Sequence, residues 1–193
     1  MTAPDLLDAL SPVLAALRDL GVRHFVGGSI ASSSHGVPRS SIDADVVAEL
    51  LPRHAAPLVA ALREAYYVSE ERVRDATLRR GSFNAIHLAT MVKVDVFVSR
   101  DRPFDRRAFE RVHTSTPEGG PSFPVSSPED TVLAKLEWFR RGGEVSERQW
   151  TDVIGVLRAG LAADEGHLRQ GAAELGVSDL LVRALEEARL SQA

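Results

Sequence analysis

The sequence predicts an α+β fold, close to α/β, in which helices flank a mixed sheet of four or five strands. Three observations predict it. Short apolar strands alternate with amphipathic helices over the first hundred residues. One of these strands carries two acids on alternate positions and another carries a third acid between valines, and helix-start signals dominate the remainder of the chain. The chain has 193 residues. We expect one core domain over residues 1–120 and a helical C-terminal part over residues 121–193.

Hydrophobic spacing sets the expected elements of the core. Leucines at helical spacing predict a first helix, which Gly21 ends. Strict alternation of apolar and polar residues predicts strands, and two of these are close enough in sequence to form a hairpin. In order, the expected elements are helix Pro4–Leu20, strand Val22–Val26, helix Ile30–His35, strand Ile42–Val47, helices Pro52–Ala65 and Ser69–Arg80, and strands Phe83–Leu88 and Val92–Val98.

The remainder of the chain reads as helical. Ser127 precedes Pro128 and two acids, which is the pattern of a helix N-terminus, and Ser146 begins a second such pattern. The Pro- and Ser-rich stretch from Gly119 to Ser127 is the expected junction between the two parts. An apolar stripe near the C-terminus is compatible with either a core or a dimer surface; it contains Leu180, Leu181 and Leu185.

Composition excludes several classes of protein. The chain has no cysteine, which excludes disulfides and thiolate metal sites. Its net charge of -4 argues against a protein that coats nucleic acid nonspecifically. No apolar run approaches the roughly 20 residues of a membrane span, so we expect a cytoplasmic protein without membrane association. Of the 23 basic residues, only Lys93 and Lys135 are lysines.

Three aspartates in two predicted strands form the first candidate site. Asp43 and Asp45 alternate with apolar residues, so both project from one face of their strand. Asp95 alternates in the same way with the valines of a later strand. If the strands are neighbours, three carboxylates meet on one surface, where mutual repulsion favours a divalent cation with oxygen ligands. The plain alternative is a solvated polar face.

A glycine turn precedes the acids. Gly27 and Gly28 allow backbone N–H groups to approach a phosphate, and Ser29 adds a hydroxyl group at the start of a predicted helix. Alone, such a turn is more often an ordinary loop. Together with the three acids in this order, it predicts a site for a nucleoside triphosphate and Mg²⁺.

The segments Phe25–Ala31 and Pro38–Val47, followed by Asp95, resemble the signature of the nucleotidyltransferase superfamily that includes DNA polymerase beta. The intermediate residues are similar to those of the small bacterial branch, which contains antibiotic nucleotidyltransferases and toxin–antitoxin or abortive-infection nucleotidyltransferases. The resemblance implies a minimal nucleotidyltransferase fold and ATP or another NTP as substrate. It also implies two Mg²⁺ ions, with Mn²⁺ as an alternative, and NMP transfer to a hydroxyl group of a small molecule, protein or tRNA.

The same resemblance implies roles for individual residues. Asp43 and Asp45 would bind both metal ions, and Asp95 would complete one metal site and help to deprotonate the attacking hydroxyl. Lys135, followed by Arg148 and Asp152 on the next helix, matches a motif of the toxin-type enzymes and implies a phosphate ligand.

Each of the outlying candidates has a simpler explanation. Lys135 could extend to solvent from its aromatic neighbours, and Arg148 and Asp152 could form an ordinary i,i+4 ion pair. Arg39 could contact phosphate or solvate a loop, and Lys93 could serve only to neutralise Asp95.

Two further features complete the sequence hypotheses. The six histidines show no metal-ligand spacing, and His35 reads as a helix-end residue. Two arginine-rich stretches, residues 72–80 and 100–111, also contain acids and read as solvated helix faces, with tRNA contact as the alternative. The rival to an enzyme is a binding module of the same fold, antitoxin-like or regulatory, that holds NTP or a cognate partner protein.

Overall fold

The structure is a computed structural model that describes residues 3–36, 43–117, 120–160 and 162–190. The chain divides into two compact units. The sheet unit comprises Met1–Gly27 and Ser40–Val125, and the helical unit comprises Gly28–Arg39 and Ser126–Ala193. A short internal segment therefore groups with the C-terminal helices, although the sequence pattern places it within the core.

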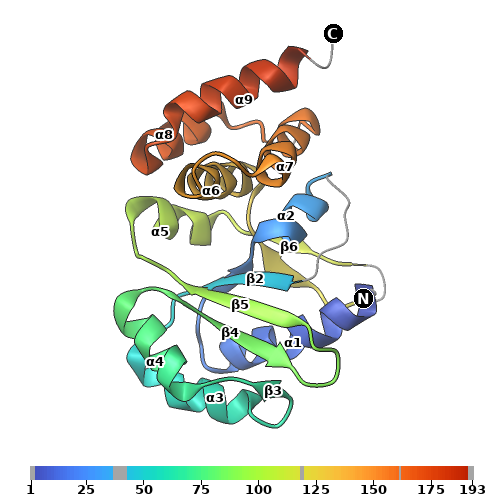
Figure 1. The fold of residues 1–193 in the computed structure, drawn as a ribbon, viewed down its shortest axis with the longest axis vertical. Coiled ribbons are helices and arrows are strands. Elements are labelled where there is room, and N and C mark those ends of the chain that lie inside the picture. Colours follow the sequence, from blue (N-terminus) through green and yellow to red (C-terminus); the bar gives the residue numbers. More distant parts are fainter. Residues whose placement is uncertain (1–2, 37–42, 118–119, 161, 191–193) are drawn as a thin grey trace. The chain divides into compact units, whose positions relative to one another are not determined.

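A mixed sheet forms the sheet unit (Figure 1). In the described part of the chain its strand order is β3-β4-β5-β2-β1-β7-β6. The central pair β2 and β5 is parallel, whereas β4 and β1 flank this pair in antiparallel fashion. The strands are β1 His24–Val26, β2 Asp43–Ala48, β3 Tyr66–Tyr67, β4 Ser82–His87, β5 Lys93–Val98, β6 His113–Ser115 and β7 Phe123–Val125.

Helices cover both sides of this sheet (Figure 1). α1 Ala3–Asp19 contacts β2 and β5, and also α3 Ala55–Leu62, which follows a 3₁₀ turn at Pro52–His54. Tyr66 joins this layer, because its hydroxyl donates a 2.7 Å hydrogen bond to the carbonyl of Ala9. α4 Glu70–Arg79 contacts β4 and β5.

The arginine-rich stretch at residues 100–111 contains α5 Pro103–Glu110. Phe109 and Ala108 are buried against Phe25, and Val47 packs beside them. Because Val47 lies on the same face of β2 as Asp43 and Asp45, α5 covers part of the face that carries the acids. The expectation of a solvated helix is correct for Arg106, which is exposed, but Arg107 is half-buried and this helix also has a buried apolar side.

The helical unit is built around α6 Pro128–Arg141. α6 contacts all four of the other helices of this unit: α2 Gly28–Ser34, α7 Glu147–Arg158, α8 Glu165–Leu175 and α9 Ser178–Leu190. The expected caps are present: the Ser127 hydroxyl accepts from the Asp130 amide, and that of Ser146 accepts from the Gln149 amide. Leu180 and Leu181 are buried in α9, so this part of the C-terminal stripe belongs to a core.

The mixed sheet and its flanking helices confirm the predicted fold class, but the predicted number of strands is too low. Instead of four or five strands, the described part of the chain has seven. The additional strands β3, β6 and β7 have two or three residues each. Segments of this length are too short to show an alternation of apolar and polar residues. One of them, β7, lies within the stretch that the sequence analysis expected to be a junction.

Candidate active site

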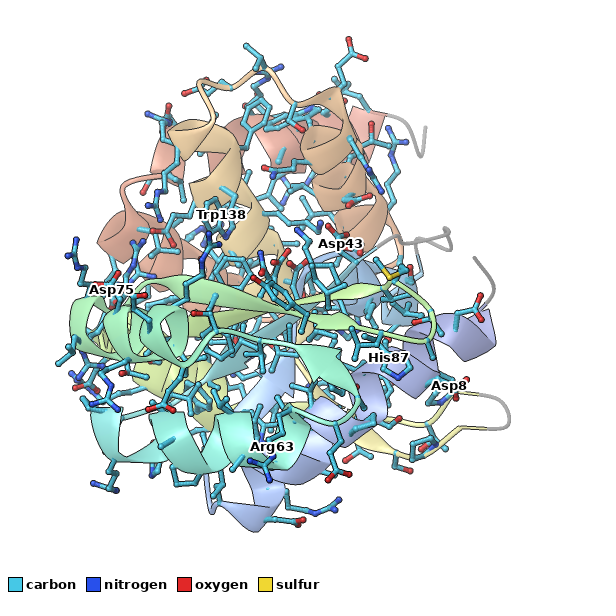
Figure 2. The ribbon with its side chains drawn as sticks, turned by 60° about the horizontal axis from the view of Figure 1, so that its bottom comes forward. Asp8, Asp43, Arg63, Asp75, His87 and Trp138 are labelled. Atoms are coloured by element: carbon cyan, nitrogen blue, oxygen red, sulfur yellow. The ribbon has the colours of Figure 1, made fainter. Side chains whose placement is uncertain are left out.

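The register of β2 and β5 brings the predicted acids together on one face of the sheet. Asp45 pairs with Asp95, and Asp43 pairs with Lys93. The residues between them, including Ala44 and Val94, are fully buried on the opposite face. The strand period of two therefore places these four charged side chains on one surface. Figure 2 labels Asp43 at the start of β2.

Lys93 lies among the carboxylates. Its Nζ is 2.6 Å from Asp95 Oδ2 and 3.8 Å from Asp43 Oδ2. The hydrogen bond with Asp95, together with the charges of Asp95, Asp43 and Asp45, raises the pKa of Lys93 above its ordinary value, against the lowering effect of partial burial. Lys93 therefore supplies a positive charge to these acids. This agrees with the alternative that Lys93 serves to neutralise Asp95.

The ammonium of Lys93 contacts the carboxylates that are the predicted metal ligands. In residues 3–36, 43–117, 120–160 and 162–190, no three acidic or histidine side chains are arranged as ligands of one metal ion. The chemistry of the donor set nevertheless suits a hard divalent cation, because it consists of carboxylate oxygens on one surface. The ammonium stands in for such a cation between Asp43 and Asp95.

Asn84 extends the polar face, and the sequence analysis did not select it. It pairs with Asp95 across β4 and β5, so Asn84, Asp95 and Asp45 form a row over three neighbouring strands. The signal was available in the sequence, because Asn84 is the polar residue between the apolar Phe83 and Ala85. Its position opposite Asp95 depends on the hairpin register, which the sequence alone does not determine.

A cavity of about 450 Å³ opens beside Asp95. Asn84 and Ser82 line it from β4, and Glu71, Arg72 and Asp75 line it from α4. Asp75 marks this helix in Figure 2. All of its lining residues belong to the sheet unit, and all are polar or charged except Phe83. One of them, Asp95, is a predicted catalytic carboxylate.

The glycine turn begins beside the second acid. The Gly27 amide donates a 2.9 Å hydrogen bond to the carbonyl of Asp45. Gly28, the first residue of α2, has a φ of 55°, which favours glycine. Ser29 follows it and is buried. The other loop candidate, Arg39, lies outside the described residues.

Lys135 and Asp152 form a buried ion pair in the helical unit. The Nζ–Oδ2 distance is 2.7 Å, and the side chains are 10% and 3% exposed. Arg148 is exposed one turn before Asp152. Lys135 therefore does not extend into solvent. Asp152 is buried beside Lys135, so it is not merely one half of an exposed i,i+4 pair with Arg148. Its expected role as a phosphate ligand stays a prediction.

A second buried polar cluster in the helical unit was not predicted. Asp130 accepts a 2.7 Å hydrogen bond from the Ser127 hydroxyl, and its other carboxylate oxygen lies 2.6 Å from His167 Nε2. The sequence predicts Asp130 only as a helix-start acid, but its carboxylate also joins α6 to α8. Separately, His35 Nε2 lies 2.7 Å from the Ser126 carbonyl, so this histidine is a buried contact and more than a helix end.

The comparisons with known proteins give a consistent fold. An antigenic nucleotidyltransferase-like protein from Paracoccidioides brasiliensis matches with a TM-score of 0.58 and 16% identity, covering 96% of this chain and 94% of that chain. The antibiotic-resistance factor ANT(2'')-Ia matches with a TM-score of 0.50 and 19% identity, covering 96% and 95%. The chain has a nucleotidyltransferase fold. No protein-family model matches the sequence, and no curated protein does.

At these identities, the likeness concerns the fold alone. The nucleotidyltransferase fold nevertheless agrees with the resemblance that the glycine turn and three acids suggest. No helix in the described part of the chain combines the length and apolar character that a membrane span requires.

Proposed function

We propose that this protein is a metal-dependent nucleotidyltransferase, which moves an NMP group from an NTP to an acceptor hydroxyl and releases pyrophosphate. One observation carries the proposal: on a nucleotidyltransferase fold, Asp43, Asp45 and Asp95 share one face of two paired strands. The Gly27 amide donates to the Asp45 carbonyl, so the glycine turn begins directly beside this acid.

Asp43 and Asp45 would hold Mg²⁺, and Asp95 would complete one of the two ion sites. When bound, two such ions stabilise the attacking and leaving oxygens of an in-line displacement. The hydrogen bond that restrains Asp95 comes from the partly exposed side chain of Lys93, so the Asp95 carboxylate can exchange this partner for another.

The reaction would proceed by attack of the acceptor oxygen on the α-phosphorus. The new bond joins the acceptor oxygen to phosphorus, and the bond from phosphorus to the bridging oxygen of pyrophosphate breaks. The proton of the hydroxyl passes to the Asp95 carboxylate, in the manner of a general base. We place the acceptor in the 450 Å³ cavity that Asp95 and Asn84 line, because an acceptor hydroxyl there would lie next to the Asp95 carboxylate.

An assay with labelled nucleotides tests the function. The protein is incubated with Mg²⁺ and each of the four NTPs, labelled at the α-phosphate, with and without a cell extract. We expect the label to move to a small molecule, protein or RNA in the presence of extract, and a γ-phosphate label to appear in pyrophosphate. NTP binding without transfer to any fraction would contradict the enzyme and favour an antitoxin-like or regulatory binding module that holds NTP or a partner protein.

A further inference from the structure

The ammonium of Lys93 lies beside two of the acids, Asp95 and Asp43, on the face that carries all three. Lys93 lies opposite Asp43 in the strand register and two residues before Asp95, so its position is set by the sheet itself. The Nζ contacts Asp95 at 2.6 Å and approaches Asp43 at 3.8 Å. Its side chain is 41% exposed, so the ammonium can swing away into solvent without any change in β5.

Electrostatics requires a cation at this place. Three carboxylates on one surface repel each other, and the repulsion is relieved when a positive charge lies between them. In the absence of a metal ion, Lys93 supplies that charge. A divalent cation that binds the same oxygens would lie within a few ångströms of the ammonium, where like charges repel.

We propose that Lys93 is a displaceable counter-ion: it holds Asp43 and Asp95 in place before metal binding and must leave Asp95 when a divalent cation enters. This inference rests on the proposed function in one respect, that the three aspartates are metal ligands. It assigns Lys93 a positioning role in assembling the site and a competing role in metal binding.

The choice of lysine fits this role. Elsewhere in the chain the basic residues are arginines, apart from Lys135. A guanidinium group binds a carboxylate through two parallel hydrogen bonds and is harder to displace, whereas an ammonium is a compact charge on a flexible stem. We therefore expect that arginine at position 93 blocks metal binding more strongly than lysine does.

Metal binding without nucleotide or acceptor tests the inference. Mn²⁺ is titrated into the full chain and followed by electron paramagnetic resonance, and the melting temperature is measured in EDTA and in Mn²⁺. For Lys93→Met we expect Mn²⁺ affinity to rise by about tenfold or more. We also expect a lower melting temperature in EDTA than for the wild type, and a larger increase when Mn²⁺ is added. Lys93→Arg should bind Mn²⁺ more weakly than the wild type.

Arg74→Met provides the matched control, because it removes an exposed cation that pairs with Glu70 on α4 of the same unit. It should leave Mn²⁺ affinity unchanged. If Lys93→Met does not fold, Lys93→Gln takes its place in the comparison. Mn²⁺ affinity that is equal to or lower than that of the wild type would overturn the inference.

The outcomes separate this inference from the proposed function. Tighter Mn²⁺ binding by Lys93→Met together with a wild type that transfers no nucleotide would support the counter-ion and contradict the enzyme. Unchanged Mn²⁺ affinity together with active transfer would overturn the counter-ion alone. Failure of every variant and the wild type to bind Mn²⁺ would overturn both the counter-ion and the metal dependence.

Discussion

Both lysines of the chain hold an aspartate, and they do so in different surroundings. Lys93 contacts Asp95 on a partly exposed sheet face, whereas Lys135 contacts Asp152 in a nearly dry interior. The first pair can open, because water can replace either partner. The second cannot open without leaving a buried charge, which is costly. The Lys93–Asp95 pair can therefore exchange partners, whereas loss of the Lys135–Asp152 pair would lower the free energy of unfolding.

Loss of the Lys135 ammonium should destabilise the helical unit. We expect Lys135→Met to lower the free energy of unfolding by about 3 kcal/mol or more, because the charge of Asp152 remains buried. Combining Lys135→Met with Asp152→Leu should recover most of this loss, since both charges are then removed. Urea denaturation followed by circular dichroism measures both.

Arg148→Met is the control for this cycle, because Arg148 is exposed on the same helix as Asp152. We expect a change within about 0.5 kcal/mol. A loss as large as that of Lys135→Met would show that Arg148, and not Lys135 alone, neutralises Asp152.

Tyr66 should make stability depend on alkaline pH. Burial raises its pKa to about 12 from the ordinary value of 10.0. Since the unfolded chain loses this proton near pH 10, the folded state is favoured fully below pH 10, and this contribution is lost as the pH rises from 10 to 12. We expect the free energy of unfolding to fall over this window more steeply in the wild type than in Tyr66→Phe.

The neighbouring tyrosine provides a control for this measurement. Tyr67 is 67% exposed, so Tyr67→Phe should retain the wild-type slope between pH 10 and 12. Equal slopes for the wild type and Tyr66→Phe would contradict a buried, neutral Tyr66 hydroxyl.

At the scale of elements, close packing of α6 and α8 depends on a glycine. A Cβ atom added to Gly171 would lie 2.5 Å from Leu133 Cδ1, and Leu133 is fully buried. The contact explains why a residue that weakens helices lies in the middle of α8. From the sequence, α8 was predictable as a helix, but the face that packs against Leu133 was not, because Gly171 has no side chain to indicate it.

Gly171→Ala should therefore destabilise the protein. Alanine in a helix interior normally stabilises by up to about 1 kcal/mol, but overpacking here should outweigh that gain and cost about 1–3 kcal/mol. Gly166→Ala on the same helix is the matched control, because its new Cβ would make only an ordinary 3.5 Å contact with Asp164. Thermal melts should rank Gly166→Ala above Gly171→Ala, and the reverse order would contradict this packing account.

The elements also show what the sequence could and could not predict. Strands β2 and β5 were predictable, because polar and apolar residues alternate over residues 43–46 and 93–96, which specifies both the strand and the face of its acids. Their pairing was a hypothesis, since nothing local specifies which strands become neighbours. The short strands β3, β6 and β7 lack a periodic signal, and their pairing is decided by the tertiary structure.

The site was predictable for the same reason and to the same extent. Asp43, Asp45 and Asp95 were recognisable from strand alternation and motif order. Asn84 was recognisable as a polar strand residue, but its position opposite Asp95 was not, because that depends on the register of a hairpin. The Asp130–His167 pair joins residues that are 37 positions apart, a separation at which no sequence pattern indicates contact.

For the molecule as a whole, the proposed nucleotidyl transfer requires that the three acids act together on one nucleotide. The fold places them on one face, and the chain's own Lys93 shows that this face attracts a cation. Their chemical role is tested by activity, because stability measurements report only on the fold.

The most direct test combines Asp43→Asn with Asp45→Asn and measures Mg²⁺-dependent transfer from α-labelled NTP. The exposed pair Asp8→Asn with Asp19→Asn on α1 is the control that removes the same charge, and circular dichroism verifies the fold of both double variants. We predict that transfer falls to background in the first and stays at the wild-type rate in the second. Transfer at the wild-type rate by a folded Asp43→Asn, Asp45→Asn protein would contradict the account.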